Sequence, residues 1–486
     1  MTRHALVGSC AVLVLALGAA APAFADEEPA GASASTEIEE VVVTARRQDE
    51  SLQDVPLAVT AFSSKDLAVK HIQSRTDLAN FTPSLITITG GYPSEFAYFA
   101  LRGQGPSFSS TPGVVPYFAE VPNPVSIDGR GGSMFDLASV QVIAGPQGTL
   151  FGKNATGGNI LFEPQRPTNT FGGYVQGEVG NYNDRRAEFA LNLPIVDGKV
   201  LFRLAGESAR RDGYTIDVGP NFKGKDYDDV HYDSVRAGLT LRFTDNLENY
   251  TVARFFQSSN NGPGTVLKQF NTTLGAGLLP VLIPFPGLAT AVADQAARDN
   301  RHVAYDQDEF SDTKYWQFVN QTTLEFSPNL KLKNIVSYSH GRYSYAYDYD
   351  ATVYPIGGQT ARGAYPSVAP NYFTEELQLQ GKAFDGGLDF TVGAYYDKQT
   401  QNTPHWGGLF TQYPISFFLG PVPATLDVTS NSHAVFAQGT LDLEKVGLPH
   451  GLSLTAGLRH TWDSSTTTTA ILAPPTTSAV VRWMLS

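Results

Sequence analysis

Residues 388–396 of this 486-residue chain read LDFTVGAYY, and this stretch carries the pattern that decides the fold. Every second residue from Leu388 to Tyr396 is apolar or aromatic, and most residues between them are polar or small. Successive side chains of a β-strand point to opposite faces, so the pattern predicts a strand with one apolar face. The same alternation recurs at 187–193, 200–204, 235–243 and 452–458. We therefore predict an extended antiparallel sheet in the C-terminal part of the chain.

The connections between these predicted strands alternate in length. Tight turns are expected at 197–198, 244–246, 327–329 and 385–387, and long polar segments lie at 210–231, 258–313, 343–370 and 399–429. Short turns on one side and long loops on the other are typical of an outer-membrane barrel. A sheet in hydrocarbon must pair every backbone group, which requires it to close on itself. A soluble β-sandwich or propeller would have short turns at both ends, so we favour a transmembrane barrel.

Composition excludes several other classes of protein. Charged residues make up 17% of the chain and the formal net charge is -13, which argues against nucleic-acid binding. The single cysteine, Cys10, rules out disulfide frameworks and cysteine-ligated metal sites. The nine histidines show no metal-ligand spacing, and neither a paired catalytic carboxylate nor a Gly-x-Ser-x-Gly element is present. We expect no enzyme activity, no cofactor and no metal site.

The N-terminus has the features of a secretory signal peptide. Arg3 and His4 precede an apolar run at 5–17, and residues 23–25 (AFA) offer a cleavage site before Asp26. A lipoprotein signal ending at Cys10 is the alternative, but few apolar residues precede that cysteine. We expect residues 1–25 to be removed on export.

A small mixed α/β region is expected before the large sheet. Its predicted strands are 55–62, 85–89, 98–101, 114–118 and 140–143. A short helix is expected from Ser63 or Ser64 to Ile72, and a further turn begins at Asp77. The glycine-rich run at 145–158 invites comparison with a phosphate-binding loop, but Lys153 lacks the glycine and the hydroxyl residue that this motif requires. We therefore assign these glycines to tight turns.

The segment 26–50 has the composition of a disordered arm, with one apolar knot at Val41–Val43. An extended β-branched knot can add as a strand to the sheet of a partner protein. It can equally be the first strand of the next domain, and spacing alone leaves both interpretations open.

Several motifs, in the right order, resemble those of TonB-dependent outer-membrane receptors. Residues 39–47 (EEVVVTARR) and 51–60 (SLQDVPLAVT) are similar to the TonB box and the entry to the plug of that family. Residues 101–103 (LRG) and 140–158 resemble plug motifs, 171–182 the first barrel hairpin, and 451–462 a mid-barrel strand. The resemblance implies a periplasmic arm at 26–50, a plug at 51–168, and barrel from 169 to 486 in the outer membrane.

The resemblance also implies a protein partner. In this family TonB grips the box strand from the periplasm and uses the proton-motive force to rearrange the plug. The box residues here would be Glu39, Glu40, Val41, Val42, Val43, Thr44 and Ala45. The resemblance thus favours the partner-strand interpretation of the apolar knot.

Two positions depart from the family pattern. The family usually has an acidic residue where this chain has Gln141 and a basic one where it has Ala144. The paired loss leaves no unpaired buried charge, so it indicates a weakened plug latch. We expect Arg102 to remain, facing Glu375 or Glu376 of the barrel; an ion pair of Arg102 within the plug is the alternative.

The chain is short for a complete family member. About eleven strands fit between Phe171 and Trp462, whereas the resemblance implies a barrel of about 22 strands. The last residues, 466–486, also differ from the family's closing strand, which ends in an aromatic residue. We therefore expect a mainly β protein: an α/β plug followed by an incomplete antiparallel transmembrane barrel that does not transport by itself.

The ligand is expected to bind at the plug apex. The segments there combine aromatic and hydroxyl side chains: Tyr92, Ser94, Phe96, Gln104, Ser107, Phe108 and Ser109. Such a surface suits a ferric siderophore or similar bulky ligand; carbohydrate, haem and cobalamin are the alternatives within the family, and an ordinary exposed loop is a further one.

Four alternating tyrosines, Tyr343, Tyr345, Tyr347 and Tyr349, are expected to form an outer aromatic girdle or to extend a strand above it, with ligand contact as the second interpretation. A passive porin would lack the α/β region at 55–166 and the box, and a secreted β-rich protein is a remaining alternative. We expect TonB, outer-membrane lipid and the ligand as partners, and no nucleic acid.

Overall fold

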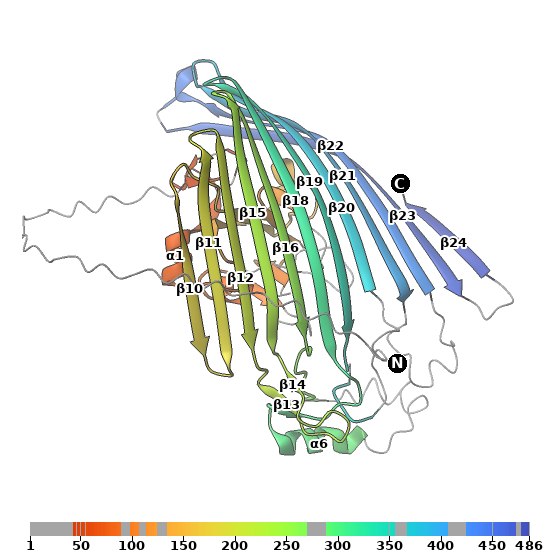
Figure 1. The fold of residues 1–486 in the computed structure, drawn as a ribbon. Helices are drawn as coiled ribbons and strands as arrows, with labels where there is room; N and C mark the ends of the chain where they lie inside the picture. The colour runs from red at the N-terminus through yellow and green to blue at the C-terminus, as the bar shows by residue number, and fades with distance from the viewer. Residues whose placement is uncertain are drawn as a thin grey trace, which may run out of the picture. The chain divides into compact units, whose positions relative to one another are not determined.

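The computed structural model describes residues 42–44, 46–48, 50–53, 55–88, 98–105, 113–123, 134–269, 288–348, 350–354, 367–406, 424–449, 451–472 and 478–485. These residues form one large antiparallel sheet and a smaller mixed α/β region that packs on one of its faces (Figure 1).

The large sheet has twelve strands, each hydrogen-bonded to the next along the chain order. The strands are β10 (Gly172–Gly180), β11 (Asp184–Val196), β12 (Val200–Arg211), β15 (Val230–Thr244), β16 (Leu247–Asn260), β18 (Phe310–Ser327), β19 (Leu330–Ala346), β20 (Ser367–Ala383), β21 (Leu388–Trp406), β22 (Ala424–Asp442), β23 (Ser453–Leu472) and β24 (Ser478–Leu485). The first eleven strands confirm the number of barrel strands expected between Phe171 and Trp462, and β24 is a twelfth strand beyond that range. Within the described residues β10 and β24 do not pair with each other, so the sheet is open.

The two faces of the sheet differ as the alternation predicts. Arg236 and Arg254 lie on the face toward the α/β region, with their guanidinium carbons 5.2 and 3.9 Å from the centre of the Phe118 ring. The neighbouring positions Val235 and Phe255 point the other way and are 44% and 39% exposed. The exposed face is therefore apolar and the covered face is largely polar, which confirms the pattern that decided the fold.

The predicted tight turns all lie at strand ends, but the long connections hold more structure than expected. Segments assigned to loops form a three-stranded sheet of β13 (Thr215–Asp217), β14 (Asp226–Tyr227) and β17 (His302–Val303), and a helix, α6 (Leu288–Arg298). The buried rings of Tyr227 and Tyr305 pack there with centroids 4.9 Å apart. Figure 1 places β13, β14 and α6 beyond the ends of the strands that lie opposite the tight turns.

The α/β region contains a five-stranded sheet in the order β3 (Ala58–Ser63), β8 (Leu137–Ala144), β9 (Gly158–Pro164), β6 (Val114–Phe118) and β7 (Val121–Pro122). A two-stranded sheet pairs β4 (Leu85–Ile88) with β5 (Tyr98–Leu101), and two strands pair near the N-terminus: β1 (Val42–Val43) and β2 (Glu50–Ser51). The helices are α1 (Ser64–Val69), α2 (Arg75–Asn80) and α3 (Gly148–Phe151), and a 3₁₀ turn spans Glu444–Val446.

Local sequence explains where α1 and α2 begin. Ser63 and Asp66 form a reciprocal capping box at α1, and Ser74 and Asp77 form the same arrangement at α2. Each box satisfies backbone donors that the first turn of a helix would otherwise leave unpaired. No helix in the described residues is both long and apolar enough to cross a membrane.

The glycine-rich run serves strand pairing. Gly158 opens β9 with φ +141°, and a Cβ there would lie 2.0 Å from the carbonyl oxygen of Ile143 on β8. Only glycine allows that approach, because any side chain would collide with the neighbouring backbone. This geometry supports the assignment of the glycines to backbone conformation.

The tyrosine ladder of β19 does not form an outer girdle. Tyr343 is 1% exposed and clusters with Tyr232, Phe256 and Tyr315 on the covered face of the sheet. Its ring stacks on that of Tyr345, with centroids 4.7 Å apart, and Tyr345 stacks on Tyr347 at 4.6 Å. Tyr349 lies outside the described residues. The girdle interpretation is therefore wrong: alternation separated the two faces correctly, but the tyrosines occupy the covered one.

Candidate functional site

The described part of the predicted TonB box is folded onto the α/β region. Val42 and Val43 form β1, which pairs antiparallel with Glu50–Ser51. The Val43 side chain is fully buried. The Thr44 backbone nitrogen donates a hydrogen bond of 2.9 Å to Oε1 of Gln141. The other predicted box residues, Glu39, Glu40, Val41 and Ala45, lie outside the described residues.

Gln141 has a specific structural task at this point. It lies on β8, is 1% exposed, and its amide nitrogen donates to the hydroxyl of Ser139 at 3.2 Å. A neutral amide thus accepts the hydrogen bond of the box backbone at the position where the family usually carries an acid. Glutamine in place of the family's usual acid at position 141 therefore removes a charge, yet the Thr44 N–H still has a hydrogen-bond acceptor.

Arg47, three residues beyond Thr44, is buried between the α/β region and the large sheet. One of its terminal nitrogens lies 3.3 Å from the Glu376 carboxylate on β20, and the other donates to the backbone oxygen of Glu120 at 2.8 Å. Its guanidinium carbon lies 4.6 Å from the ring centre of Phe151. Buried charges are stable only when they are paired and hydrogen-bonded, and Arg47 meets both conditions.

The residues on either side of Arg47 extend this attachment. Arg46 donates to the Thr440 hydroxyl on β22 at 2.8 Å, and Gln48 donates to the Thr391 hydroxyl on β21 at 3.0 Å. The amide of Gln380 on β20 donates to the Arg47 backbone oxygen at 2.9 Å. We call Arg46, Arg47 and Gln48 the clamp, because these three consecutive residues join three neighbouring strands of the large sheet.

Glu120 supplies the second carboxylate of this region. It sits in the turn between β6 and β7 with φ +67°, and its carboxylate pairs with Lys333 of β19. Burial acts to raise the pKa of Glu120, but Lys333 and Arg47 outweigh it and hold the pKa below its usual range. Glu163, on β9, lacks such compensation: burial, and then the nearby charge of Glu120, raises its pKa to about 8.

The backbone is strained at Arg47 of the clamp and in the β6–β7 turn that Arg47 contacts. Arg47, Glu120 and Ala119 all have positive φ, at 64°, 67° and 48°. Non-glycine residues in this conformation cost free energy and persist where the surrounding contacts hold them. The strain lies where the residues that follow the predicted box meet the large sheet, which singles out this junction as a candidate functional site.

The expected latch is not formed by Arg102. Arg102 is exposed, with φ +52°, and within the described residues it makes no ion pair. Glu376 pairs with Arg47 instead. Glu375 points to the opposite face of β20, where its carboxylate accepts from Nδ2 of Asn334 at 3.3 Å. The arginine that pairs with Glu376 is therefore Arg47 and not Arg102. In the sequence, Arg47 is marked only as the last residue of the 39–47 motif.

Most of the predicted ligand surface cannot be placed. Tyr92, Ser94, Phe96, Ser107, Phe108 and Ser109 lie outside the described residues. Gln104 is exposed and follows β5, with its backbone bridged to Leu101. The ligand site at the plug apex stays a prediction.

One carboxylate group was not anticipated from the sequence. Asp306, Asp348 and Asp350 offer oxygens that lie within 4.8 Å of one another in the long connections. Burial, and then the charges of the two neighbours, raises the pKa of Asp348 to about 10. Asp306 is more than forty positions from Asp348 and Asp350 in the sequence, so no local spacing could have indicated the group. We assign it no ligand.

Comparison with known protein families agrees with this fold. Residues 51–159 match the TonB-dependent receptor plug domain, and residues 268–485 match the TonB-dependent receptor-like β-barrel. The chain therefore belongs to the TonB-dependent receptors, the family of outer-membrane β-barrel proteins that its motifs resemble. The α/β region is the plug of that fold, and the large sheet belongs to its barrel.

Individual relatives are siderophore receptors and related proteins. The chain is 24% identical over 442 residues to the ferrichrome outer membrane transporter/phage receptor of Escherichia coli. The matched region covers 85% of this chain and 54% of that protein. It is 32% identical over 179 residues to the pesticin receptor of Yersinia pestis, covering 36% of this chain and 26% of the relative.

Solved structures show the same fold. The ferric yersiniabactin uptake receptor of Yersinia pestis superposes with a TM-score of 0.68 at 19% identity, covering 88% of this chain and 60% of that one. The ferric-catecholate import receptor of E. coli gives 0.65 at 15% identity, covering 90% and 67%. The chain thus spans about half to two thirds of the length of relatives that match most of it.

Proposed function

We propose that this chain is part of a receptor that takes up a ferric siderophore or a similar bulky ligand across the outer membrane, with TonB as its energy-supplying partner. The observation that carries the proposal is the folded box strand, Val42–Val43, followed directly by the clamp. Family membership and the siderophore receptors among the relatives support it. Carbohydrate, haem or cobalamin remain the alternative ligands, and we propose no enzymatic role.

The geometry supports a sequence of release steps. TonB would bind the box by adding a strand to its own sheet edge, so β1 must first leave β2 and the Thr44–Gln141 hydrogen bond must break. The clamp is the next point at which a pull on the arm meets resistance. We propose that opening of the Arg47–Glu376 pair frees the plug from β20–β22.

The export signal at 1–25 and the roles of the apex residues stay predictions. We propose that the apex contributes Tyr92, Ser94, Phe96, Gln104, Ser107, Phe108 and Ser109 to the ligand site. The inward tyrosine cluster around Tyr343 lies on the covered face of the sheet near its long connections, and so it adds aromatic surface on the side from which the ligand enters.

Capture of the full chain by the isolated periplasmic domain of TonB tests the coupling role. Val42→Pro removes the backbone donor of a residue in β1, so we expect binding to fall at least tenfold. Val42→Thr keeps both the donor and the β-branched shape and is the matched control, for which binding within twofold of wild type is expected.

Equal capture of the wild type and of Val42→Pro would refute the box assignment. Ligand identity needs a separate measurement: ferric siderophores of different chelating chemistry, haem, cobalamin and oligosaccharides are titrated against the chain in detergent. Saturable binding of a metal-free sugar, with none of any ferric chelate, would overturn the siderophore proposal while leaving the TonB step intact.

A further inference from the structure

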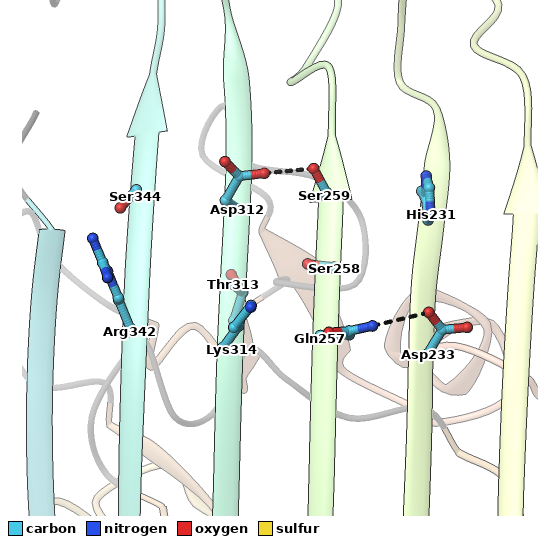
Figure 2. A pocket seen from close by; sticks show the side chains of 10 residues that line it. All are labelled: His231, Asp233, Gln257, Ser258, Ser259, Asp312, Thr313, Lys314, Arg342 and Ser344. Atoms are coloured by element: carbon cyan, nitrogen blue, oxygen red, sulfur yellow. Dashed lines mark hydrogen bonds between the residues drawn. The ribbon is translucent and has the colours of Figure 1, made fainter. Parts of the chain in front are cut away.

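The outward face of the large sheet, which points away from the plug, carries an apolar band with a clear limit on the side of the long connections. At this limit the outward side chains are charged, as Asp233 on β15, Lys314 on β18 and Arg342 on β19 show (Figure 2). Two residues closer to the tight turns they are apolar: Val235 on β15 and Trp316 on β18. A charge within such a band is costly where the band faces lipid, so it needs a physical explanation.

Two oppositely charged residues lie inside this band, on the neighbouring strands β20 and β21. Glu375 lies between Phe373 and Leu377 among the outward positions of β20. Lys398 is the register partner of Phe373, and the next outward position of β21 is Tyr396. Both charged side chains are exposed. An ionisable residue on a membrane-spanning surface marks a candidate interaction site, because a partner would remove the cost of exposing it to lipid.

The two charges have no counter-charge within the described residues. The Glu375 carboxylate accepts a hydrogen bond from the Asn334 amide at 3.3 Å and makes no ion pair there. The Lys398 side chain makes neither an ion pair nor a hydrogen bond in the same part of the chain. Glu375 pairs in register with Tyr396, two residues before Lys398, so the two charges are diagonal neighbours with Cα atoms roughly 7–8 Å apart. They lie on either side of the line between β20 and β21.

Uncharged polar residues of the outward face satisfy one another instead. Asn249 and Asn320 exchange two amide hydrogen bonds between β16 and β18, at 3.0 and 3.1 Å. Each amide also donates to a threonine hydroxyl: Asn249 to Thr322 at 2.8 Å, and Asn320 to Thr251 at 2.7 Å. This closed network needs no partner outside the chain. Glu375 and Lys398 have no such network, which distinguishes them from these four residues.

A two-fold axis between β20 and β21, along the membrane normal, would give both charges a partner. A two-fold interface uses the same patch on both copies, so that if residue i contacts j, then j contacts i. Glu375 of each copy then faces Lys398 of the other, and the flexible lysine stem spans their offset of one register row. The same axis exchanges β19 with β22, whose outward residues Asn334, Asn431 and His433 both donate and accept hydrogen bonds. The patch is therefore self-complementary.

We propose that a second copy of this chain covers β20 and β21 within the membrane, in a two-fold dimer held by two Glu375–Lys398 ion pairs between the copies. Phe373 and Tyr396, the register partners of these charges, would exclude lipid and water from both ion pairs. The plug packs on the opposite face of the sheet, so this contact does not involve it. The inference goes beyond the proposed uptake function and requires only the membrane location of the family.

Energy transfer between labelled copies of the full chain in phosphatidylcholine vesicles tests this dimer. A donor or an acceptor dye is attached at Asp245→Cys, in the exposed turn between β15 and β16, in a Cys10→Ser background. Glu375→Lys places two lysines opposite each other at each contact, and Lys398→Glu places two glutamates there. Each variant by itself should associate at least tenfold more weakly than wild type, because like charges then meet across the interface.

A mixture of the two variants separates pairing between copies from pairing within one chain. A Glu375→Lys chain beside a Lys398→Glu chain has opposite charges at both contacts, although each chain by itself carries two like charges. Association of donor-labelled E375K with acceptor-labelled K398E should therefore return to within threefold of the wild-type value. An ion pair inside one chain could not be restored in this way, so the absence of recovery would overturn the proposal.

Arg185→Glu is the matched control. Arg185 is exposed on β11, which six strands separate from β20 in the order of the sheet, so the same reversal of charge should change association less than twofold. Val42→Pro should also leave association unchanged, which separates this interface from the TonB step. Glu375→Gln keeps the shape of the side chain and covers the case in which a lysine there prevents insertion; it should weaken association at least threefold. Wild-type association of Glu375→Gln, or of both charge-reversed variants by themselves, would overturn the proposal.

Discussion

Arg47, just before the plug, and Arg102, within it, both have positive φ, but their surroundings differ completely. Arg47 is 5% exposed, pairs with Glu376, donates to the backbone of Glu120 and lies against Phe151. Arg102 is exposed and makes no ion pair in the part of the chain that the structure describes. The comparison teaches that an arginine anchors this region to the sheet where it is removed from water, because a surface charge gains little from a partner.

The largest effect is expected where a buried charge loses its partner. Glu376→Ala leaves Arg47 buried without its carboxylate, which should destabilise the closed clamp by about 3 kcal/mol. Backbone hydrogen exchange at Arg46–Gln48, followed by mass spectrometry of the full chain, should then accelerate by roughly two orders of magnitude. Glu375→Ala, one residue away on the opposite face, is the control and should leave that exchange rate unchanged. Equal acceleration by both variants would show that the Arg47 pair does not hold the clamp.

A smaller, pH-dependent effect is expected at Glu163, beside the clamp. Its pKa of about 8 in the folded protein lies above the ordinary value of 4.5, so the folded state binds the proton more tightly. The resulting stability is complete below pH 4.5 and is lost as the pH rises through 8. The Glu163 residue as a whole is only half-buried, so we expect an effect of roughly 1–2 kcal/mol.

The neutral variant Glu163→Gln isolates this contribution. The difference in unfolding free energy between wild type and Glu163→Gln, from urea titrations in detergent at matched pH, should grow as the pH rises from 5 to 9, with the variant becoming the more stable protein. A difference that stays constant over this range would mean that Glu163 is ionised at neutral pH and that the clamp region is well hydrated.

The smallest effect is expected at Arg102. Arg102→Ala removes an exposed charge that has no acidic partner in the described residues, so the unfolding free energy should change by no more than about 0.5 kcal/mol. Arg47→Ala, measured in the same urea titration, should cost several times as much. A loss at Arg102 as large as that at Arg47 would restore the latch that the sequence suggested.

Local signals in the sequence predicted the plug and the strands well. The strands Tyr98–Leu101 and Val114–Phe118 have the predicted bounds, since their apolar runs end at glycines or turn residues. The start of α1 at Ser64 follows from the Ser63–Asp66 capping box. Alternation located the large sheet because a one-residue change of register would have exchanged its faces.

These local signals could not predict contacts between residues that are far apart in the sequence. Nothing near Arg47 in the sequence marks Glu376 as its partner, and the strand Gly158–Pro164 was missed because it begins at a glycine and ends at a proline. The β13–β14–β17 sheet joins pieces of two or three residues from different connections, too short for any periodicity. The tyrosines of β19 show the same limit, because alternation cannot say which of two faces meets the plug.

The short pairing of β1 with β2 has a mechanical consequence. A force applied at the N-terminal side of Val42 loads its few backbone hydrogen bonds one after another, so we expect this hairpin to peel open under a weak pull. The clamp is attached to three strands at once and carries the load in parallel, so we expect it to yield only at a higher force. The arm would then lengthen in two stages. In the first stage it extends at low force, so that TonB can engage before any work is done on the plug.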